Sequence, residues 1–477
     1  MKDLIAGLSL LMLIANGVNA DEKLVWPRFR GPNGSGVAEG EKPPTELGPD
    51  KNVKWKVPVP AGISSPIIAG ENLVLTAFDD GKLYTIAYRR SDGSEAWRTE
   101  APAEKLELFH KTEGSPAAST PATDGKHIVS YFGSCGLFCY DLAGKQLWHV
   151  EMPPATIGGD FGSGVSPIIE GGTVVLVRDE MKAPKIMAFD VASGAPRWEQ
   201  KRTSSTSWCT PVIWDTPDGK QVAAAGHVRM VGYDLTSGSE RWSCVGLPSG
   251  CCSSPVTIAR TLFFAGSSSG GADDGPAMPS FDEMLKNLDT DKDGAISRAE
   301  GEKAFGGFFD NQDSNKDGTV SREEYETILK FMAEGKNSAF ALKAGGSGDV
   351  TESNTLWKRT KGLPYVASGI LYDNQFVMIR DGGIVIACDA KSGKQVYQER
   401  AADTGRYYAS PVAAGGNIYL TALESGVITV VKGGSGKAVV VAKNPELGER
   451  CAATPAIADN CLYVRTATQL YAFGEEK

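Results

Sequence analysis

The chain has 477 residues and is acidic, with a formal net charge of −9 and only four histidines. A negative surface repels phosphate backbones and anionic headgroups, so the composition argues against nucleic-acid and anionic-membrane partners. The nine cysteines are odd in number, so pairing within one chain would leave at least one thiol free.

The first twenty residues have the features of a secretory signal peptide. Lys2 precedes an apolar run over residues 4–14, and Val18 and Ala20 occupy the −3 and −1 positions of a cleavage site. We expect residues 1–20 to be removed, residues 21–50 to form an N-terminal extension, and the mature protein to be periplasmic or secreted without a transmembrane segment. The alternatives are a buried N-terminal helix and an uncleaved anchor.

Two short markers recur along the chain. In the first, a turn glycine precedes an aromatic residue by four positions, as in DVASGAPRW (190–198), DLTSGSERW (234–242), DAKSGKQVY (389–397) and DLAGKQLW (141–148). In the second, Ser or Thr precedes a proline and a short apolar run, at Pro66, Pro121, Pro167, Pro211, Pro255, Pro411 and Pro455, with Gly369 in the place of an eighth proline. Most steps between the second markers span about 42 to 55 residues, the spacing typical of propeller blades.

Alternating apolar segments between the markers predict β-strands, for example NLVLTAF and NIYLTAL. Eight markers therefore predict an all-β, eight-bladed propeller over residues 51–267 and 338–477. The last blade lacks an outer strand, and the segment around Trp55 supplies one. Pairing of the two chain ends would close the ring and remove free sheet edges.

With these markers, the chain resembles the PQQ-like propeller repeat proteins, in which a turn glycine and a tryptophan end each blade. WPRFRGPNGSG (26–36) is also similar to the opening of secreted bacterial members. The resemblance implies the propeller fold, while the family name by itself does not imply a bound quinone.

One step, from Pro255 to Gly369, is far longer than the others, and we expect residues 268–337 to be an insertion between the second and third strands of blade 5. Ser280 and Glu283 predict a capping box at the start of a helix. Two twelve-residue loops follow, DTDKDGAISRAE (289–300) and DSNKDGTVSREE (313–324), and both match the EF-hand pattern. The residues between them are interrupted by Gly306 and Gly307, which predicts a compact helical pair.

The loops predict two calcium sites, because alternate oxygen donors and a final glutamate suit the coordination of Ca²⁺. The predicted ligands of the first site are Asp289, Asp291, Asp293, Ala295 through its carbonyl, Ser297 and Glu300. Those of the second site are Asp313, Asn315, Asp317, Thr319, Ser321 and Glu324.

The insertion should lie over the channel mouth, since the connections into the inner strands lie on the same face. Residues 267–337 contain 16 acidic against 8 basic side chains, a net charge of −8. Clustered carboxylates repel one another without a cation. We therefore expect the insertion to be loose without calcium and ordered with it.

Segments leading into inner strands carry aromatic and charged residues that would gather at the mouth. These are Phe109, His110, Lys111, Asp160, Phe161, Trp208, Tyr365, Arg406, Tyr407 and Tyr408. They suit a protein, peptide or carbohydrate ligand, and the alternative is a water-filled polar rim. A binding or scaffolding module is the function that we predict.

Two other functions stay open. A PQQ-dependent alcohol dehydrogenase would use adjacent cysteines and a tryptophan floor, for which Cys251, Cys252 and Trp208 are the candidates, although no catalytic residue can be assigned. An outer-membrane protein assembly scaffold is the other, because the propeller lipoprotein of that machinery shares this repeat. This chain has no cysteine directly after Ala20 for lipid attachment.

Overall fold

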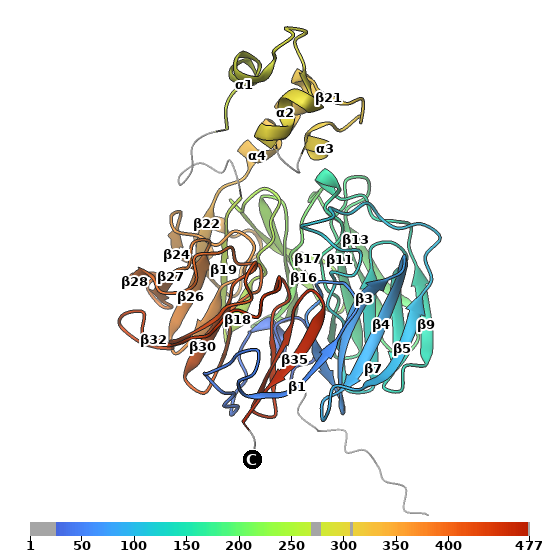
Figure 1. Ribbon diagram of the computed structural model, residues 1–477, viewed down its shortest axis with the longest axis vertical. Helices are drawn as coiled ribbons and strands as arrows, with labels where there is room; N and C mark the ends of the chain where they lie inside the picture. The colour runs from blue at the N-terminus through green and yellow to red at the C-terminus, as the bar shows by residue number, and fades with distance from the viewer. Residues whose placement is uncertain (1–24, 269–277, 306–308, 476–477) are drawn as a thin grey trace, which may run out of the picture.

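The protein is a ring of eight β-sheets with a small helical insertion at one end (Figure 1). The computed structural model describes residues 25–268, 278–305 and 309–475, so the expected signal peptide lies outside the described residues. Consecutive strands pair antiparallel within each sheet, as the alternating segments predicted. The eight-bladed propeller expected from the markers is confirmed.

The first four blades follow the chain order. Blade 1 comprises β2 (Ile67–Ala69), β3 (Asn72–Asp79), β4 (Lys82–Arg89) and β5 (Glu95–Ala101). Blade 2 comprises β6 (Ala122–Thr123), β7 (His127–Phe132), β8 (Gly136–Asp141) and β9 (Gln146–Glu151). Blade 3 comprises β10 (Ile168–Glu170), β11 (Thr173–Arg178), β12 (Lys185–Asp190) and β13 (Pro196–Lys201). Blade 4 comprises β14 (Val212–Thr216), β15 (Gly219–Ala225), β16 (Arg229–Asp234) and β17 (Glu240–Val245).

The remaining blades include the interrupted one and the closing one. Blade 5 comprises β18 (Val256–Ile258), β19 (Thr261–Gly266), β22 (Ser338–Lys343) and β24 (Thr355–Arg359). Blade 6 comprises β25 (Ile370–Tyr372), β26 (Gln375–Arg380), β27 (Ile384–Asp389) and β28 (Gln395–Arg400). Blade 7 comprises β29 (Val412–Ala414), β30 (Asn417–Thr421), β31 (Ile428–Lys432) and β32 (Val440–Lys443). Blade 8 comprises β33 (Ala456–Ala458), β34 (Cys461–Arg465), β35 (Gln469–Phe473) and β1 (Val53–Pro58).

The ring closes through its two chain ends. β1 pairs antiparallel with β35, and Trp55 lies opposite Ala472. The N-terminal strand is thus the outer strand of the last blade, as expected. Closure joins the first and last blades through main-chain hydrogen bonds.

The glycine and tryptophan of the first marker meet between neighbouring blades. The indole of Trp148 in blade 2 donates a hydrogen bond to the carbonyl of Val191 in blade 3, at 2.9 Å. Gly194 lies over the same indole with φ 72°, and a Cβ there would approach it to 2.8 Å. Trp55, Trp97, Trp198 and Trp357 donate to the next blade in the same way. The marker therefore encodes blade-to-blade packing.

The Ser or Thr of the second marker forms a closed ring of hydrogen bonds around the channel. The backbone amide of each marker Ser or Thr donates a hydrogen bond to the side-chain hydroxyl of the marker residue in the next blade, at 2.9–3.1 Å. The ring runs through Ser65, Thr120, Ser166, Thr210, Ser254, Ser368, Ser410 and Thr454 and returns to Ser65. All eight blades are tied together at this level.

The N-terminal extension crosses the channel at the end opposite the insertion (Figure 1). Its short 3-10 helix η1 (Pro32–Gly34) carries Asn33, whose side chain bonds to Ile213 of blade 4 and Thr257 of blade 5. Val37 pairs with Ala413 of blade 7. The motif at residues 26–36 therefore forms a floor beneath the inner strands.

The insertion lies between β19 and β22, as predicted. It contains α1 (Phe281–Leu288), β20 (Ile296–Ser297), α2 (Arg298–Phe305), α3 (Phe309–Gln312), β21 (Thr319–Val320) and α4 (Arg322–Glu334). The capping box of Ser280 and Glu283 is present at the start of α1. A small core of its own holds the insertion together, made of Phe281, Met284, Ile296, Phe309, Val320 and Tyr325. The expected interruption at residues 306 and 307 lies outside the described residues.

Two short elements were not expected from the sequence. β23 (Gly348–Asp349) pairs parallel with the outer strand β17 of blade 4, and α5 (Thr351–Asn354) follows it. This segment covers the edge of blade 4 beside Trp242. The indole of Trp242 turns inward and donates to Gln221 within its own blade instead of reaching the next one.

Candidate calcium centre and channel mouth

The first EF-hand loop brings three carboxylates together. Oxygen atoms of Asp289, Asp291 and Asp293 all lie within 4.8 Å of one another. Gly294 has φ 87°, a conformation that favours glycine, and its amide donates to Asp289 Oδ2 at 3.1 Å. The loop is therefore folded with its predicted acidic residues pointing toward a common point.

Glu300 closes the first loop from its twelfth position. Its Oε1 accepts hydrogen bonds from the amide and hydroxyl of Thr290, and its Oε2 from those of Ser297. The bonds from Ser297, followed by those from Thr290, lower the pKa of Glu300 to about 2. Its carboxylate is thus ionised at neutral pH and ready to coordinate a cation.

Asp291 behaves differently because other carboxylates surround it. A hydrogen bond from the Asp293 amide lowers its pKa, but desolvation and the charges of Asp293, Glu300 and Asp289 together outweigh that bond. The net effect is a raised pKa. Like charges therefore do gather in this loop, as the sequence predicted.

The second loop repeats the arrangement in a more enclosed position. Asp313 is 2 % exposed, and its Oδ2 accepts from the Gly318 amide at 2.9 Å. Glu324 is 9 % exposed, and both of its oxygens accept hydrogen bonds. The second loop is joined to the first by the pairing of Ile296 in β20 with Val320 in β21.

The donor set of both loops fits calcium. Carboxylates, an amide oxygen, hydroxyls and backbone carbonyls are hard oxygen ligands, which Ca²⁺ prefers in groups of six to eight. All twelve predicted ligand residues lie in the part of the chain that the structure describes, with Ser297 in β20 and Thr319 in β21. The assignment of individual ligands stays a prediction.

The insertion is attached to the face of the propeller where connections lead into the inner strands. Glu334 at the end of α4 lies 3.0 Å from Nε2 of His227, in the β15–β16 connection. The His227 ring also stacks on Phe331 of α4, with ring centres 4.4 Å apart. Just beyond the helix, the Lys336 amide donates to the Leu247 carbonyl at 2.9 Å. These contacts fix the C-terminal end of the insertion.

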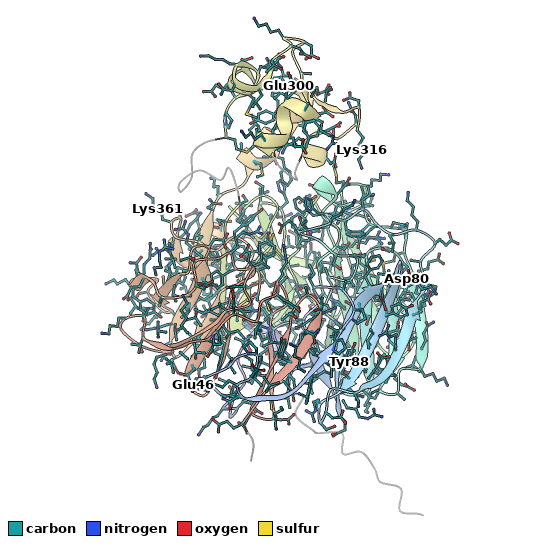
Figure 2. The ribbon with its side chains drawn as sticks, in the orientation of Figure 1. Glu46, Asp80, Tyr88, Glu300, Lys316 and Lys361 are labelled. Atoms are coloured by element: carbon teal, nitrogen blue, oxygen red, sulfur yellow. The ribbon has the colours of Figure 1, made fainter. Side chains whose placement is uncertain are left out.

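A second attachment comes from inside a calcium loop. Lys316, between the predicted ligands Asn315 and Asp317, forms an ion pair with Asp160 at 2.9 Å. Lys316 lies on the side of the insertion nearer the propeller, whereas Glu300 lies farther away (Figure 2). Asp160 ends the 3-10 helix η2 (Gly158–Asp160) in the connection from blade 2 to blade 3. The second loop thus contacts the channel mouth directly.

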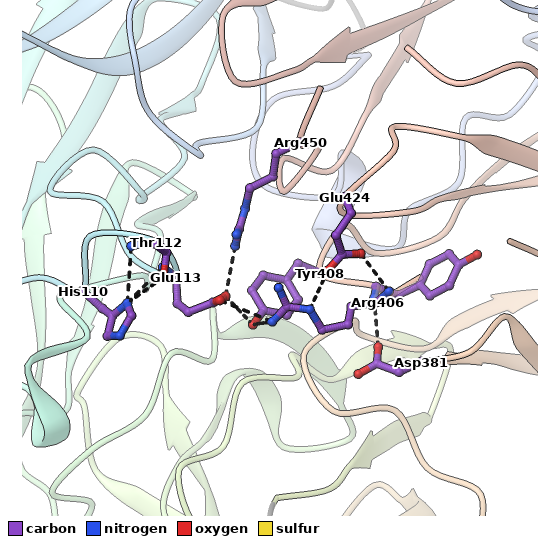
Figure 3. Close-up of polar contacts among 9 residues, drawn as sticks. His110, Thr112, Glu113, Asp381, Arg406, Tyr408, Glu424 and Arg450 are labelled. Carbon is purple, nitrogen blue, oxygen red and sulfur yellow. Dashed lines mark hydrogen bonds and ion pairs between the residues drawn. The ribbon is translucent and has the colours of Figure 1, made fainter. Parts of the chain in front are cut away.

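A polar cluster spans the mouth. Glu113, in the connection from blade 1 to blade 2, accepts from the hydroxyl of Tyr408 at 2.7 Å and from Arg450 at 3.0 Å. Arg406 contacts the same carboxylate at 3.3 Å and also pairs with Glu424 at 2.6 Å. These side chains approach from different sides of the ring (Figure 3). The cluster therefore links blade connections that are almost 300 residues or more apart in the sequence.

The charge of Glu113 is stabilised by its partners. Burial raises its pKa, but hydrogen bonds from Tyr408 and Arg450 and the charges of both arginines outweigh burial, so the pKa lies below its usual range. Both guanidinium groups also lie 5.5 Å from the centre of the Tyr408 ring. The Arg406 side chain is 42 % exposed, so solvent reaches the cluster.

Aromatic residues form another part of the mouth, next to Glu113, whose amide donates to His110 Nδ1 at 3.2 Å. His110 stacks on Phe161 with ring centres 5.4 Å apart, and the edge of Phe161 meets Trp208 at 5.8 Å. The Trp208 indole donates to the Gly162 carbonyl at 2.8 Å, and its amide donates to Cys251. The predicted mouth residues thus divide into an aromatic part and a charged part.

The remaining predicted residues differ in their exposure. Tyr407 is buried and donates to the Asp403 carbonyl, while Phe109 packs its ring edge against Phe78 of blade 1. Tyr365 is exposed. Sequence reasoning missed Glu113, Arg450 and Glu424, and only their position in blade connections could have pointed to them.

The cysteines are buried and unpaired. All nine are free thiols in the structure, and Cys252 is the one that is not fully buried. Cys209 lies beside the Cys251 carbonyl, at 3.1 Å from sulfur to oxygen. Burial raises the pKa of Cys209 and of Cys252. The Trp208 amide donates to the Cys251 carbonyl, so the backbone of Trp208 lies next to that of Cys251 and Cys252.

Glu107 is a buried carboxyl beneath the mouth. It is 3 % exposed, and its Oε2 accepts from the amide and hydroxyl of Ser163 at 3.0 and 2.7 Å. Burial raises its pKa to about 7 despite these bonds and the charge of Arg178. The sequence offered no signal for it, because its burial depends on the path of the connection between blades 1 and 2.

The chain matches known families in two parts. Residues 86–270 and 347–474 match the family model described as outer membrane protein assembly factor BamB, and residues 281–300 and 308–330 match the EF-hand model. Among the described residues, no helix is long and apolar enough to cross a lipid bilayer.

Individual relatives are distant. The outer membrane protein assembly factor BamB of Burkholderia pseudomallei is 26% identical over 227 residues, 45% of this chain and 54% of that protein, so the chain spans about half the length of this curated relative. The crystal structure of BamB from Moraxella catarrhalis matches 88% of this chain and 99% of that one, with a TM-score of 0.52 and 13% identity. Quinohemoprotein alcohol dehydrogenase from Comamonas testosteroni matches 96% of this chain and 82% of that one, with a TM-score of 0.56 and 11% identity.

The two structural likenesses show the propeller fold alone, because the identities are low. The family model, by contrast, covers more than half of the chain and leaves out the insertion between the fifth-blade strands. This protein is therefore a PQQ-like repeat propeller that belongs to the outer membrane protein assembly factor BamB family and carries an inserted EF-hand pair.

Proposed function

We propose that this protein is an exported, calcium-binding propeller that acts as a binding or scaffolding module. Its partner would be a protein or peptide that docks at the channel mouth, beneath and beside the EF-hand insertion. A carbohydrate is the other ligand class that the aromatic and charged side chains of the mouth suit. Export would follow from cleavage after Ala20.

The observation that carries this proposal is the contact between a calcium loop and the mouth. Lys316 belongs to the second loop and pairs with Asp160, which directly precedes the aromatic residue Phe161. Since the N-terminal extension covers the other end of the channel, the mouth on the insertion side is the accessible one. Calcium in the loop would hold Lys316 in place and so fix the insertion on the binding face.

Family membership favours a protein partner. BamB is described as an assembly factor for outer membrane proteins, and a propeller that assembles other proteins presents its loops as a docking surface. For this chain we propose the same general role, scaffolding, with calcium as an added requirement. The partner's identity does not follow from the family.

The dehydrogenase alternative has one observation in its favour. Trp208 and Cys251 are neighbours through the 2.9 Å bond between the Trp208 amide and the Cys251 carbonyl, and Cys252 follows directly. PQQ would supply redox chemistry there if it bound. The buried thiols would have to pair as a disulfide to match the arrangement that the resemblance implies.

Calorimetry with separate additions of Ca²⁺ and PQQ tests the proposal. We expect calcium to bind at two sites and to raise the melting temperature, and the double variant Asp289→Ala plus Asp313→Ala to lose both effects. The matched control, Asp282→Ala plus Asp310→Ala, removes two exposed carboxylates of the same insertion that are not predicted ligands. Calcium binding that persists in the double variant would refute the two predicted calcium sites. PQQ binding together with alcohol oxidation would refute the scaffold function and support the dehydrogenase function.

A further inference from the structure

Arg30 is a buried cation with too few partners. It lies in the N-terminal extension and is 0 % exposed, and its Nη2 donates to the Gly369 carbonyl at 2.6 Å. Its Nε and Nη1 have no hydrogen-bond partner among the described residues. A guanidinium group has five N–H donors, so most of its capacity is unused.

Three other buried arginines, Arg178, Arg202 and Arg465, have more partners than Arg30, and Arg28 has a carboxylate, that of Glu170, at 3.8 Å. Arg202 makes a two-point ion pair with Asp179 at 2.6 and 3.1 Å, and Arg178 pairs with Glu180 at 3.1 Å. Arg465 has no carboxylate partner, but its two terminal nitrogens donate to four oxygens, Ser64 O, Ser64 Oγ, Thr76 O and Pro60 O. Arg30 has neither a carboxylate nor such a set of oxygens.

The charge of Arg30 is also uncompensated. Burial lowers its pKa to about 9, and no carboxylate of the described chain acts against this. The group therefore stays charged at neutral pH. An isolated buried charge destabilises the folded state unless a counter-charge lies near it. Water can accept the free N–H groups but supplies no charge.

The surroundings of Arg30 are enclosed on the channel side. Gly36 lies so close that a Cβ there would be 3.6 Å from Arg30 Nη2 and 3.0 Å from the Pro411 carbonyl. Gly36, Gly369 and Pro411 are all buried. The free Nε and Nη1 atoms are buried as well, so any partner of Arg30 other than protein must be small.

We propose that Arg30 holds a small monovalent anion of the halide class in the channel, between the N-terminal extension and the inner strands. The anion accepts from the free N–H groups at Nε or Nη1 and neutralises the guanidinium. The motif WPRFRGPNGSG then has a second role besides covering the channel, since it brings the cation that holds the ion. The anion links the extension to blades 6 and 7, where Gly369 and Pro411 lie.

Anomalous diffraction from protein purified and crystallised in sodium bromide tests the proposal on the unaltered chain. We expect a bromide peak in contact with Nη1 or Nε of Arg30. Density for water alone at that position, with no anomalous signal, would overturn the proposal. This test needs no variant and does not depend on calcium binding or on any partner.

Melting in chloride and in gluconate, at one ionic strength and with saturating calcium, gives a second readout. We expect the melting temperature of the wild type to rise with chloride concentration, because the ion binds the folded state. Arg30→Gln should lose this dependence, and Arg465→Gln should keep it, since Arg465 is satisfied by protein oxygens. Equal melting temperatures of the wild type in the two salts would contradict the proposal.

Discussion

At the scale of single residues, Glu107 shows how burial controls a charge in this fold. Its pKa of about 7 in the folded protein lies above the ordinary glutamate value of 4.5, because burial disfavours the carboxylate. The folded state therefore binds the proton more tightly than the unfolded state. The stability that the protonated group contributes is fully present below pH 4.5 and is lost as the pH rises through 7.

We predict that Glu107→Gln removes this pH dependence. Relative to the variant, the wild type should lose up to about 3 kcal/mol of unfolding free energy between pH 4.5 and pH 8. Urea unfolding of both proteins over this range measures the difference. A difference that does not change with pH would show that Glu107 has the same pKa in the folded and unfolded chains.

At the scale of elements, the ring of marker hydroxyls accounts for the second sequence marker. Thr454 is 2 % exposed, and its hydroxyl accepts from the Ser410 amide at 2.9 Å. Valine has nearly the same shape but no hydroxyl. Its introduction would leave the Ser410 amide buried without an acceptor.

We predict that Thr454→Val destabilises the protein by about 1 to 3 kcal/mol, the usual cost of an unsatisfied buried amide. The matched control is Thr429→Val, because Thr429 is also fully buried but its hydroxyl has no hydrogen-bond partner. That change should be close to neutral. Denaturant unfolding measures the loss of unfolding free energy in each variant. Equal losses in the two variants would mean that the hydrogen bonds of the hydroxyl ring add no stability beyond side-chain packing.

The elements that the sequence predicted well are those defined by contacts between neighbouring blades. Gly194 and Trp148 belong to successive repeats, so their packing recurs at a fixed spacing and is visible in the sequence. The EF-hand loops could also be predicted from the sequence, because all of the predicted ligands of one site lie within twelve consecutive residues. By contrast, β23 was missed, since a two-residue strand has no periodic pattern and its pairing with β17 is set by the tertiary fold.

At the scale of the whole molecule, the two ends of the propeller channel differ: the N-terminal extension covers one end, and the EF-hand insertion is attached at the other. The N-terminal extension contacts inner strands of several blades at one end, and the insertion attaches at the other. The cluster around Glu113 could not be predicted, because its members come from connections that meet only after the ring has closed. Arg406 and Tyr408 were recognised as mouth residues, but the carboxylate that joins them to Arg450 was not.

Calcium should act at this scale by fixing the insertion on the mouth. The ligand carboxylates repel one another without a cation, and Lys316 can pair with Asp160 only while its loop keeps its shape. The propeller ring does not depend on the loops, since its strands, tryptophans and marker hydroxyls are elsewhere. Chelation should therefore loosen the insertion and leave the ring intact.

Amide hydrogen exchange with calcium and with a chelator tests this central claim most directly. The account predicts faster exchange without calcium in residues 280–305 and 309–334 and in the contact segment 158–161, with unchanged protection in the blade strands. The variant Asp289→Ala plus Asp313→Ala should exchange at the faster rate even when calcium is present. Equal protection of the insertion with and without the chelator would contradict the account, because calcium would then not organise the face where the partner is proposed to bind.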